Sequence, residues 1–81
     1  MIFPIQIRAA RALVGLSQQD LAEHASVSLG TIKRIEAAGI ELSGTAQTMA
    51  RIQRALENAG IIFIDQDGEG GPGVRLRQHL P

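Results

Sequence analysis

Apolar residues between positions 5 and 59 recur at spacings of three and four, the pattern of helices that each bury one side. The clearest case is the segment 45–60, whose apolar stripe consists of Met49, Ile52, Leu56 and Ala59. Thr45 is placed to cap the start of this helix, and Gly60 fits the left-handed position that often closes one. The segment 5–16 has a similar pattern, with an inner stripe of Ile7, Ala10 and either Leu13 or Val14.

Residues 17–36 form two shorter helical segments joined by a tight turn. Ser17 and Ser28 are each placed to cap the start of a helix. The linking dipeptide Ser26-Val27 is too short for an antiparallel pair of long helices, and it allows two helices that cross at a steep angle. The segment 37–44, AAGIELSG, has no helical period and is predicted to be a loop.

The pattern changes to that of β-strands after Gly60. Residues 61–64 are a β-branched and aromatic run, residues 74–77 alternate between apolar and basic, and a glycine-rich stretch separates them. This predicts a hairpin in which Val74 and Leu76 face inward. The expected fold is therefore mainly α, with a helical domain over residues 1–60 and a β-hairpin extension over residues 61–81.

The segment from Ser17 to Glu36 resembles the helix-turn-helix of the phage-repressor or Cro-like (Xre) transcriptional regulators. The matching positions are Gln18, Leu21, Ala22, Val27, Ser28, Ile32, Ile35 and Glu36, and the similarity extends from Ile7 to about Gly60. The turn of this family usually carries glycine, whereas here it is Ser26, where a left-handed backbone would cost about 1 kcal/mol. Either the turn relaxes or the protein tolerates this strain. The resemblance implies a four-helix, repressor-like domain that binds double-stranded DNA sequence-specifically as a small transcriptional regulator.

The resemblance also implies which residues contact the DNA. The helix at about Ser28–Ala37 is the expected recognition helix, which enters the major groove. Arg34 is the strongest candidate for direct readout, because the two N–H edges of its guanidinium group can bind guanine O6 and N7 together. The full set expected at the bases is Ser28, Leu29, Gly30 and Arg34. The residues expected at the phosphates are Ser17, Gln18, Lys33, Arg8 and Arg11.

The net charge of the chain is zero, whereas DNA-binding domains are usually basic. Residues 1–54 hold six Lys and Arg against four Asp and Glu, and residues 55–81 hold two against four. The helical part is thus mildly basic and the tail mildly acidic. Binding by one copy would be weak, because few phosphates are neutralised. A homodimer on a palindromic operator is therefore expected.

The predicted hairpin is the expected site of dimerisation. Its first strand is apolar on both faces. One face can pack on the helices, and the other face needs a second surface to bury it from water. A lone two-stranded hairpin is marginal in water, and a bare apolar edge invites pairing with another chain. The residues assigned to this interface are Ile61, Ile62, Phe63, Ile64, Val74 and Leu76. In the simpler alternative, the hairpin packs only on the fourth helix of its own chain.

Other functional classes find less support. No cysteine and no His-x-x-x-His pair is present, so neither a metal nor a cofactor is expected. Gly68 to Gly73 matches the pattern G-x-G-x-x-G, but a strand follows where a dinucleotide site requires a helix. Two histidines and no recognisable catalytic arrangement argue against an enzyme. The absence of a long apolar segment and of a secretory signal favours a soluble, cytoplasmic protein without membrane contact.

A protein-interaction module is the main alternative function. Small Xre-like proteins include antitoxins, whose tails bind and inhibit a second protein. The apolar strand 61–64 and the acidic loop that follows it would serve such a partner, and this function can coexist with DNA binding.

Overall fold

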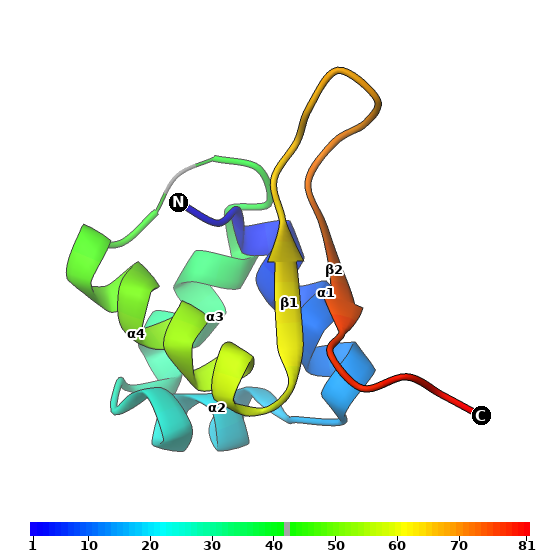
Figure 1. Ribbon diagram of the computed structural model, residues 1–81. Helices are drawn as coiled ribbons and strands as arrows, with labels where there is room; N and C mark the ends of the chain where they lie inside the picture. Colours follow the sequence, from blue (N-terminus) through cyan, green and yellow to red (C-terminus); the bar gives the residue numbers. More distant parts are fainter. Residues whose placement is uncertain (42) are drawn as a thin grey trace.

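Four helices and a β-hairpin follow one another along the chain (Figure 1) in a computed structural model that describes residues 1–41 and 43–81. The elements are α1 (Pro4–Val14), α2 (Gln18–Ala25), α3 (Leu29–Ala37), α4 (Ala46–Asn58), β1 (Ile61–Ile64) and β2 (Gly73–Leu76). The predicted mainly α fold with a C-terminal hairpin is confirmed. The predicted loop 37–44 begins one residue later than expected, because Ala37 still belongs to α3, and its Leu42 lies outside the described residues.

The predicted caps set the starts of three helices. The hydroxyls of Ser17, Ser28 and Thr45 accept the backbone N–H groups of Asp20, Thr31 and Thr48, at 2.9, 3.1 and 3.1 Å. Ser17 N–H also donates to the Asp20 carboxylate at 3.0 Å, which completes a capping box with aspartate in the place of the usual glutamate. This backbone hydrogen bond, with a contribution from the Ser17 hydroxyl, lowers the pKa of Asp20 from its ordinary value.

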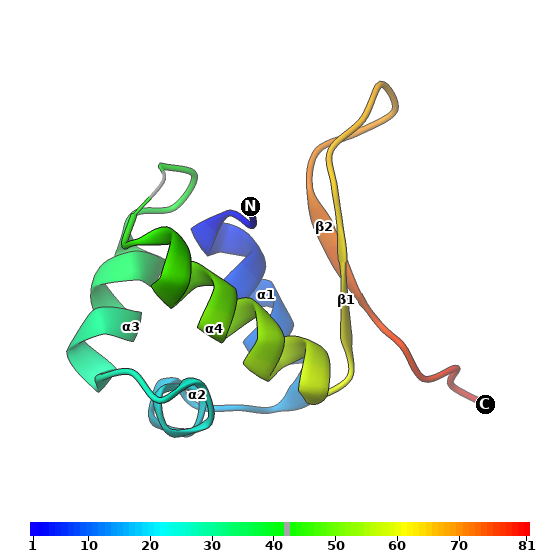
Figure 2. The same ribbon diagram turned by 60° about the vertical axis from the view of Figure 1, so that its left-hand side comes forward.

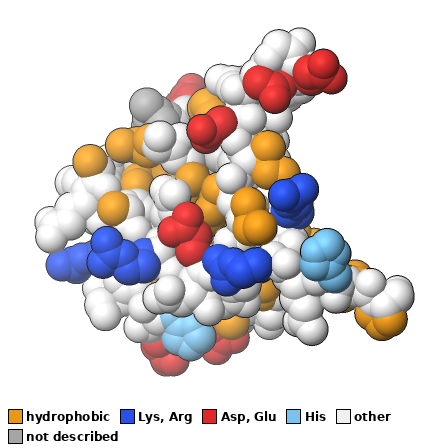
Figure 3. All heavy atoms as spheres, viewed as in Figure 1, with side chains coloured by type: hydrophobic (Ala, Val, Ile, Leu, Met, Phe, Trp, Pro, Cys, Tyr) orange, Lys and Arg blue, Asp and Glu red, His pale blue; other side chains and the backbone are white. Residues whose placement is uncertain are grey.

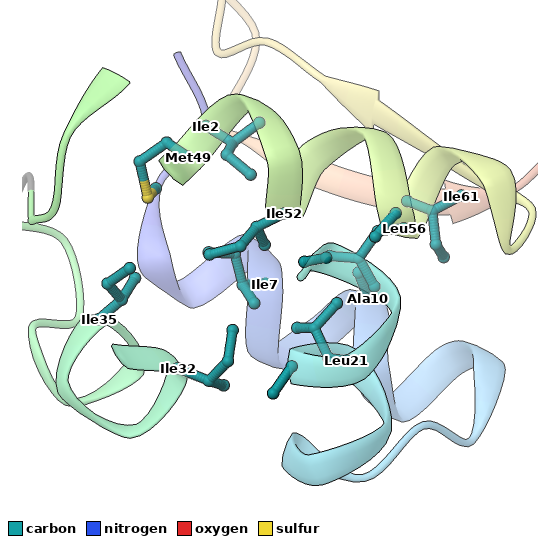
Figure 4. Close-up of a cluster of buried hydrophobic side chains, with 13 residues drawn as sticks. Ile2, Ile7, Ala10, Leu21, Ile32, Ile35, Met49, Ile52, Leu56 and Ile61 are labelled. Carbon is teal, nitrogen blue, oxygen red and sulfur yellow. The ribbon is translucent and has the colours of Figure 1, made fainter. Parts of the chain in front are cut away.

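The hydrophobic core lies where the four helices meet (Figure 4). Side chains that are almost completely buried come from every helix and from β1: Ile7, Leu21, Ile32, Ile35, Met49, Ile52, Leu56 and Ile61. On α1, Val14 packs against this core and Leu13 is 45% exposed, which decides between the two candidates for the inner stripe. On α4 the stripe is corrected: Ala55 is buried, whereas Ala59, the capping residue that follows the last residue of α4, is exposed.

The hairpin packs on α1 through β2 and on α4 through β1, and Figure 2 shows it as a separate layer beside the helices. Its antiparallel register pairs Ile61 with Leu76 and Phe63 with Val74, so these four residues share one face. Ile61 is fully buried and the other three pack against the core cluster, as predicted for Val74 and Leu76. Ile62, Ile64 and Arg75 occupy the opposite face.

This arrangement corrects the set of residues assigned to a dimer interface. Ile61 has an exposed fraction of 0%, so it has no surface left for a partner. Phe63, Val74 and Leu76 are half-buried against the helices of their own chain. Of the six assigned side chains, only Ile62 and Ile64 point away from the core, because successive residues of a strand face opposite sides.

One buried amide connects α1 to the far end of the hairpin. Gln6 is 4% exposed, and its Nε2 donates to the carbonyl oxygens of Gly73 and Ile64 at 3.0 and 3.3 Å. Its Oε1 accepts the N–H of Phe3 at 2.7 Å. At the other end, Nη2 of Arg77 donates to the carbonyl oxygen of Glu57 in α4 at 3.0 Å. The hairpin is therefore held at both ends by hydrogen bonds as well as by its inner apolar face.

Candidate nucleic-acid interface

The turn between α2 and α3 is tight and contains a left-handed residue. Ser26 has φ 57° and ψ 45°, and it is the only non-glycine residue with a positive φ among residues 1–41 and 43–81. The turn has therefore not relaxed: serine adopts the left-handed backbone at the position where the family usually has glycine, at a cost of about 1 kcal/mol. The N–H of Val27 closes the turn by donating to the carbonyl of Ala22 at 3.0 Å.

Helix α3 buries one side and exposes the other. Ile32 and Ile35 lie in the core, while Ser28, Gly30, Lys33 and Arg34 are exposed and Leu29 is half-buried. The hairpin lies on the opposite side of the molecule from α3, as Figure 2 shows, so the tail of the chain does not cover this surface. We call the residues Ser28, Leu29, Gly30, Lys33 and Arg34 the α3 surface.

Gly30 lies within α3 in a position that the protein's own packing does not require to be glycine. A Cβ atom added there would meet nothing closer than the Ser28 hydroxyl, at 3.9 Å. No positive φ is found at this residue. Gly30 is the second residue of α3, so glycine costs less here than the about 1 kcal/mol, relative to alanine, of a helix interior. Packing within the chain therefore does not account for glycine at this exposed position.

An ion pair fixes α3 against α1. Nε and Nη2 of Arg11 each lie 2.7 Å from a carboxylate oxygen of Glu36, and Nη1 donates to the carbonyl of Leu16 at 3.0 Å. Glu36 is 4% exposed, and its Oε1 also accepts Nε2 of Gln18 at 3.2 Å. The hydrogen bonds to Glu36 raise the pKa of Arg11 above its ordinary value. The buried carboxylate is thus shared by α1 and α2, and it sets the orientation of the last turn of α3.

A shallow depression lies beside this ion pair, between α1, the start of α2 and the later part of α3. Its lining consists of Arg8, Arg11, Gln18, Lys33, Glu36 and Ala37. Arg8 and Lys33 are exposed, and neither cation forms an ion pair with another described residue. The backbone N–H groups of Gln18 and Gln19, at the positive end of α2, make no hydrogen bond to the rest of the described chain. Two cations and a helix N-terminus face the same space, which suits an anionic group.

A helix-turn-helix family model matches residues 7–57, a stretch that runs from α1 almost to the end of α4. The chain belongs to the Cro/C1-type helix-turn-helix family. This is a family of DNA-binding domains and not of enzymes. A search of curated proteins found no match to the chain.

In this helix-turn-helix domain, the residues predicted at the bases occupy the α3 surface together. Of those predicted at the phosphates, Arg8, Gln18 and Lys33 line the depression next to it. Arg11 also lines it, but its guanidinium is bonded to Glu36 and Leu16, so the structure does not leave it free for a phosphate. The hydroxyl of Ser17 caps α2. Gln6 and the Arg11–Glu36 pair were not found by sequence reasoning, because no local pattern marks either.

Neither a metal cluster nor a membrane-spanning helix is found in the parts of the chain that the structure describes. No three His, Cys, Asp or Glu side chains gather there as metal ligands. Over the same residues, the helices are too short or too polar to cross a bilayer. The G-x-G-x-x-G stretch lies in the hairpin loop and leads into β2, as its sequence context predicted.

Proposed function

We propose that this protein binds double-stranded DNA sequence-specifically, as a small transcriptional regulator, with α3 in the major groove. The observation that carries the proposal is Gly30. It lies on an exposed helix surface and has open space at its Cβ position. No atom of the chain itself lies close to this position. In this proposal the absence of a side chain at Gly30 allows DNA to approach the helix backbone closely.

The side chains around Gly30 supply the contacts that a base sequence requires. Arg34 is exposed one turn further along α3, where its guanidinium group can donate two hydrogen bonds, to O6 and N7 of a guanine. Leu29 can contact a thymine methyl, and Ser28 lies at the N-terminal end of the helix, which points toward the bases in this docking mode. In this proposal Lys33, Arg8 and the N-terminus of α2 with Gln18 and Ser17 hold the phosphates, which position the domain without reading sequence.

We further propose that the regulator acts as a homodimer on a palindromic operator. The cations that one copy offers to phosphate are few, and the affinity of such contacts falls steeply with salt. Two copies double these contacts and place the recognition helices about 34–36 Å apart, one turn of B-DNA.

The test begins with selection of bound duplexes from a random pool, followed by titration of three variants on the selected sequence. Arg34→Ala is expected to cost about 1–3 kcal/mol and to relax specificity at one base position. Lys33→Ala is expected to weaken all duplexes alike and to reduce the salt dependence by about one phosphate contact. Gly30→Ala is expected to stabilise the fold by up to about 1 kcal/mol and yet to weaken operator binding.

Ala50 on α4 supplies a matched control, because it is an exposed helix position outside the α3 surface. The variant Ala50→Gly should lower stability by up to about 1 kcal/mol without changing operator affinity, which separates helix stability from DNA contact. If Gly30→Ala and Arg34→Ala both bind the selected duplex as tightly as the unaltered protein, α3 is not the reading helix.

A protein partner is the second candidate function, as in antitoxin-like members of this kind of protein. It is favoured by the outer face of the hairpin, where Ile64 is 39% exposed next to the acidic loop. A specific protein that co-purifies with the full-length chain, and is lost from the variant Ile64→Asp while DNA binding is retained, would support this function. Loss of neither activity in that variant would remove it.

A further inference from the structure

A hollow of about 320 Å³ lies between the C-terminal end of α2 and the second half of α4, and it shares no lining residue with the depression beside the Arg11–Glu36 pair. Its lining includes His24, Ser26, Arg51, Arg54, Ala55 and Asn58. A second hollow of the same volume is lined by His24, Ala55, Asn58 and Ala59. Because the two hollows have lining residues in common, they form one groove, which we call the α2–α4 groove. On the face shown in Figure 3, basic side chains gather beside α4 and a histidine lies below them, over α2.

The polar side chains of the groove come from two helices. Arg51, Arg54 and Asn58 follow one another at spacings of three and four along α4, so they lie on one side of this helix, and all three are exposed. Ala55, on the same side of α4, is only 7% exposed, because α4 packs against α2 there. His24 is exposed in the last turn of α2 and lines both hollows together with Asn58. The groove is thus a space between two elements and not the solvated side of a single helix.

The two arginines of the groove have no ion-pair partner among the described residues. By contrast, Arg11 is paired with Glu36, and Arg77 donates to the carbonyl of Glu57. The chain has as many acidic as basic residues, and yet no Asp or Glu lines either hollow. Two guanidinium groups without a carboxylate beside them give the groove a positive potential, which attracts an anion.

The end of α2 carries a partial negative charge, because the last carbonyl groups of a helix have no partner within it. Here two of these groups are occupied. The carbonyl of Ala22 accepts the N–H of Val27 at 3.0 Å, and the carbonyl of Glu23 accepts the N–H of Ser26 at 3.3 Å. The two full charges of Arg51 and Arg54 therefore outweigh the partial charge at the end of α2, and they set the sign of the potential in the groove.

The lining of the groove changes along its length. Arg51 and Arg54 line only the first hollow, whereas Ala59 lines only the second. Guanidinium groups bind carboxylate and phosphate oxygens through paired N–H donors, and the methyl groups of Ala55 and Ala59 can contact an aliphatic chain. Asn58 lines both hollows, and its amide can donate or accept a hydrogen bond between them. Volumes at the lower end of the range for small-molecule sites suit a ligand with a few carbon atoms.

We propose that the α2–α4 groove binds a small organic anion, with a carboxylate or phosphate group between Arg51 and Arg54 and a short aliphatic part against Ala55 and Ala59. A DNA phosphate would leave the uncharged end of the groove empty, which favours a small molecule with an apolar part. Ser26, whose left-handed backbone forms the turn before α3, lines the groove, so the ligand would contact the helix-turn-helix itself. This inference goes beyond the proposed function and does not require it, because the ligand would bind in the absence of DNA.

The first test titrates the full chain, labelled with nitrogen-15, with acetate, butyrate and propyl phosphate at constant ionic strength. Butyrate and propyl phosphate are expected to shift the amide signals of Ser26, Ala55 and Asn58. Butyrate should bind about fivefold more tightly than acetate, because its additional CH₂ groups are partly buried. Equal affinities for acetate and butyrate, or equal shifts at Gln18 and Lys33, would show unspecific attraction of anions and overturn the proposal. So would shifts in the groove that appear only with a peptide of glutamates or with a DNA duplex, since these assign the groove to a macromolecule.

The second test removes the two charges. The double variant Arg51→Gln/Arg54→Gln changes only exposed side chains and is expected to weaken the binding of propyl phosphate at least about tenfold. Arg75→Gln is the matched control, because Arg75 is an exposed arginine on the hairpin outside the groove, and its loss should change the affinity less than about twofold. Thermal unfolding without ligand is measured on the same variants. A double variant that unfolds more easily but binds propyl phosphate as tightly as the parent would mean that the arginines only offset the partial charge at the end of α2, which overturns the proposal.

Discussion

The helical domain and the hairpin are held in place by different means. In the helical domain, every helix contributes at least one almost completely buried side chain to a shared core, and three of the four starts are capped by hydroxyls. The hairpin contributes one fully buried residue, Ile61, and three half-buried ones. The hairpin is attached to the helices by its inner apolar face and by side-chain hydrogen bonds. The amide of Gln6 donates to Ile64 and Gly73, and the guanidinium of Arg77 donates to the carbonyl of Glu57.

Because of this difference, the free energy of local unfolding is expected to differ between the helical domain and the hairpin. Segments with few buried apolar contacts and exposed backbone hydrogen bonds open at lower free energy than a core does. The hairpin is therefore the region expected to open at the lower free energy. The following variants test the comparison, beginning with the largest expected effect.

Ile52→Ala and Val74→Ala compare the two regions directly. Ile52 is completely buried among the helices, and its truncation is expected to lower the free energy of unfolding by about 3.5 kcal/mol. Val74 is half-buried on the hairpin, and its truncation should cost only about 1 kcal/mol. Urea denaturation measures both losses. Equal losses would show that the hairpin is packed as firmly as the helices.

Arg11→Met tests the ion pair inside the helical domain. It leaves the buried carboxylate of Glu36 without its cation, which is expected to cost about 3 kcal/mol in thermal or urea unfolding. The double variant Arg11→Met/Glu36→Leu removes both charges and should recover most of the loss. Arg51→Met is the control on an exposed arginine and is expected to change stability by less than about 0.5 kcal/mol. A single variant as stable as the parent would mean that the pair contributes little.

Gln6→Leu tests the attachment of the hairpin. The side chain keeps a similar size but no longer donates to Ile64 and Gly73 or accepts from Phe3, so a loss of about 2 kcal/mol is expected. Amide hydrogen exchange should speed up in β1 and β2 while α2, α3 and α4 keep their protection. Gln47→Leu, at an exposed position of α4, serves as the control. Faster exchange spread evenly over all helices would refute a local role for Gln6.

Ser26→Gly has the smallest expected effect. Glycine relieves the strain of the left-handed turn but adds conformational freedom to the unfolded chain, so the net gain is about 0.5 kcal/mol. Ser26→Val should instead destabilise, because a β-branched residue tolerates a positive φ poorly. The melting temperatures of the two variants are compared with that of the parent. A destabilised Ser26→Gly would show that the serine side chain makes a contribution larger than the strain.

The sequence predicted the helical domain more completely than the hairpin or the site. The caps at Ser17, Ser28 and Thr45, the inner stripes and the tight turn at Ser26 depend on residues within one helical turn of each other, so a local pattern reveals them. The sequence predicted the last residues of the apolar stripes less well. In the structure Val14 rather than Leu13 packs on the core, and Ala55 rather than Ala59 is buried. For the hairpin, the sequence predicted that Val74 and Leu76 face inward. It did not predict which residues of the first strand face the helices and which face away from them.

By itself, the sequence determined the order of the elements, their caps and the family to which the chain belongs, because each follows from spacings of a few residues. Only the tertiary structure decided that Arg11 pairs with Glu36, 25 positions away, and that Gln6 reaches Gly73, 67 positions away. It also decided that Ile61 belongs to the core while Ile62 and Ile64 lie on the outer face of the hairpin. Such contacts depend on how helices and strands pack together, and packing brings together residues that no local period relates.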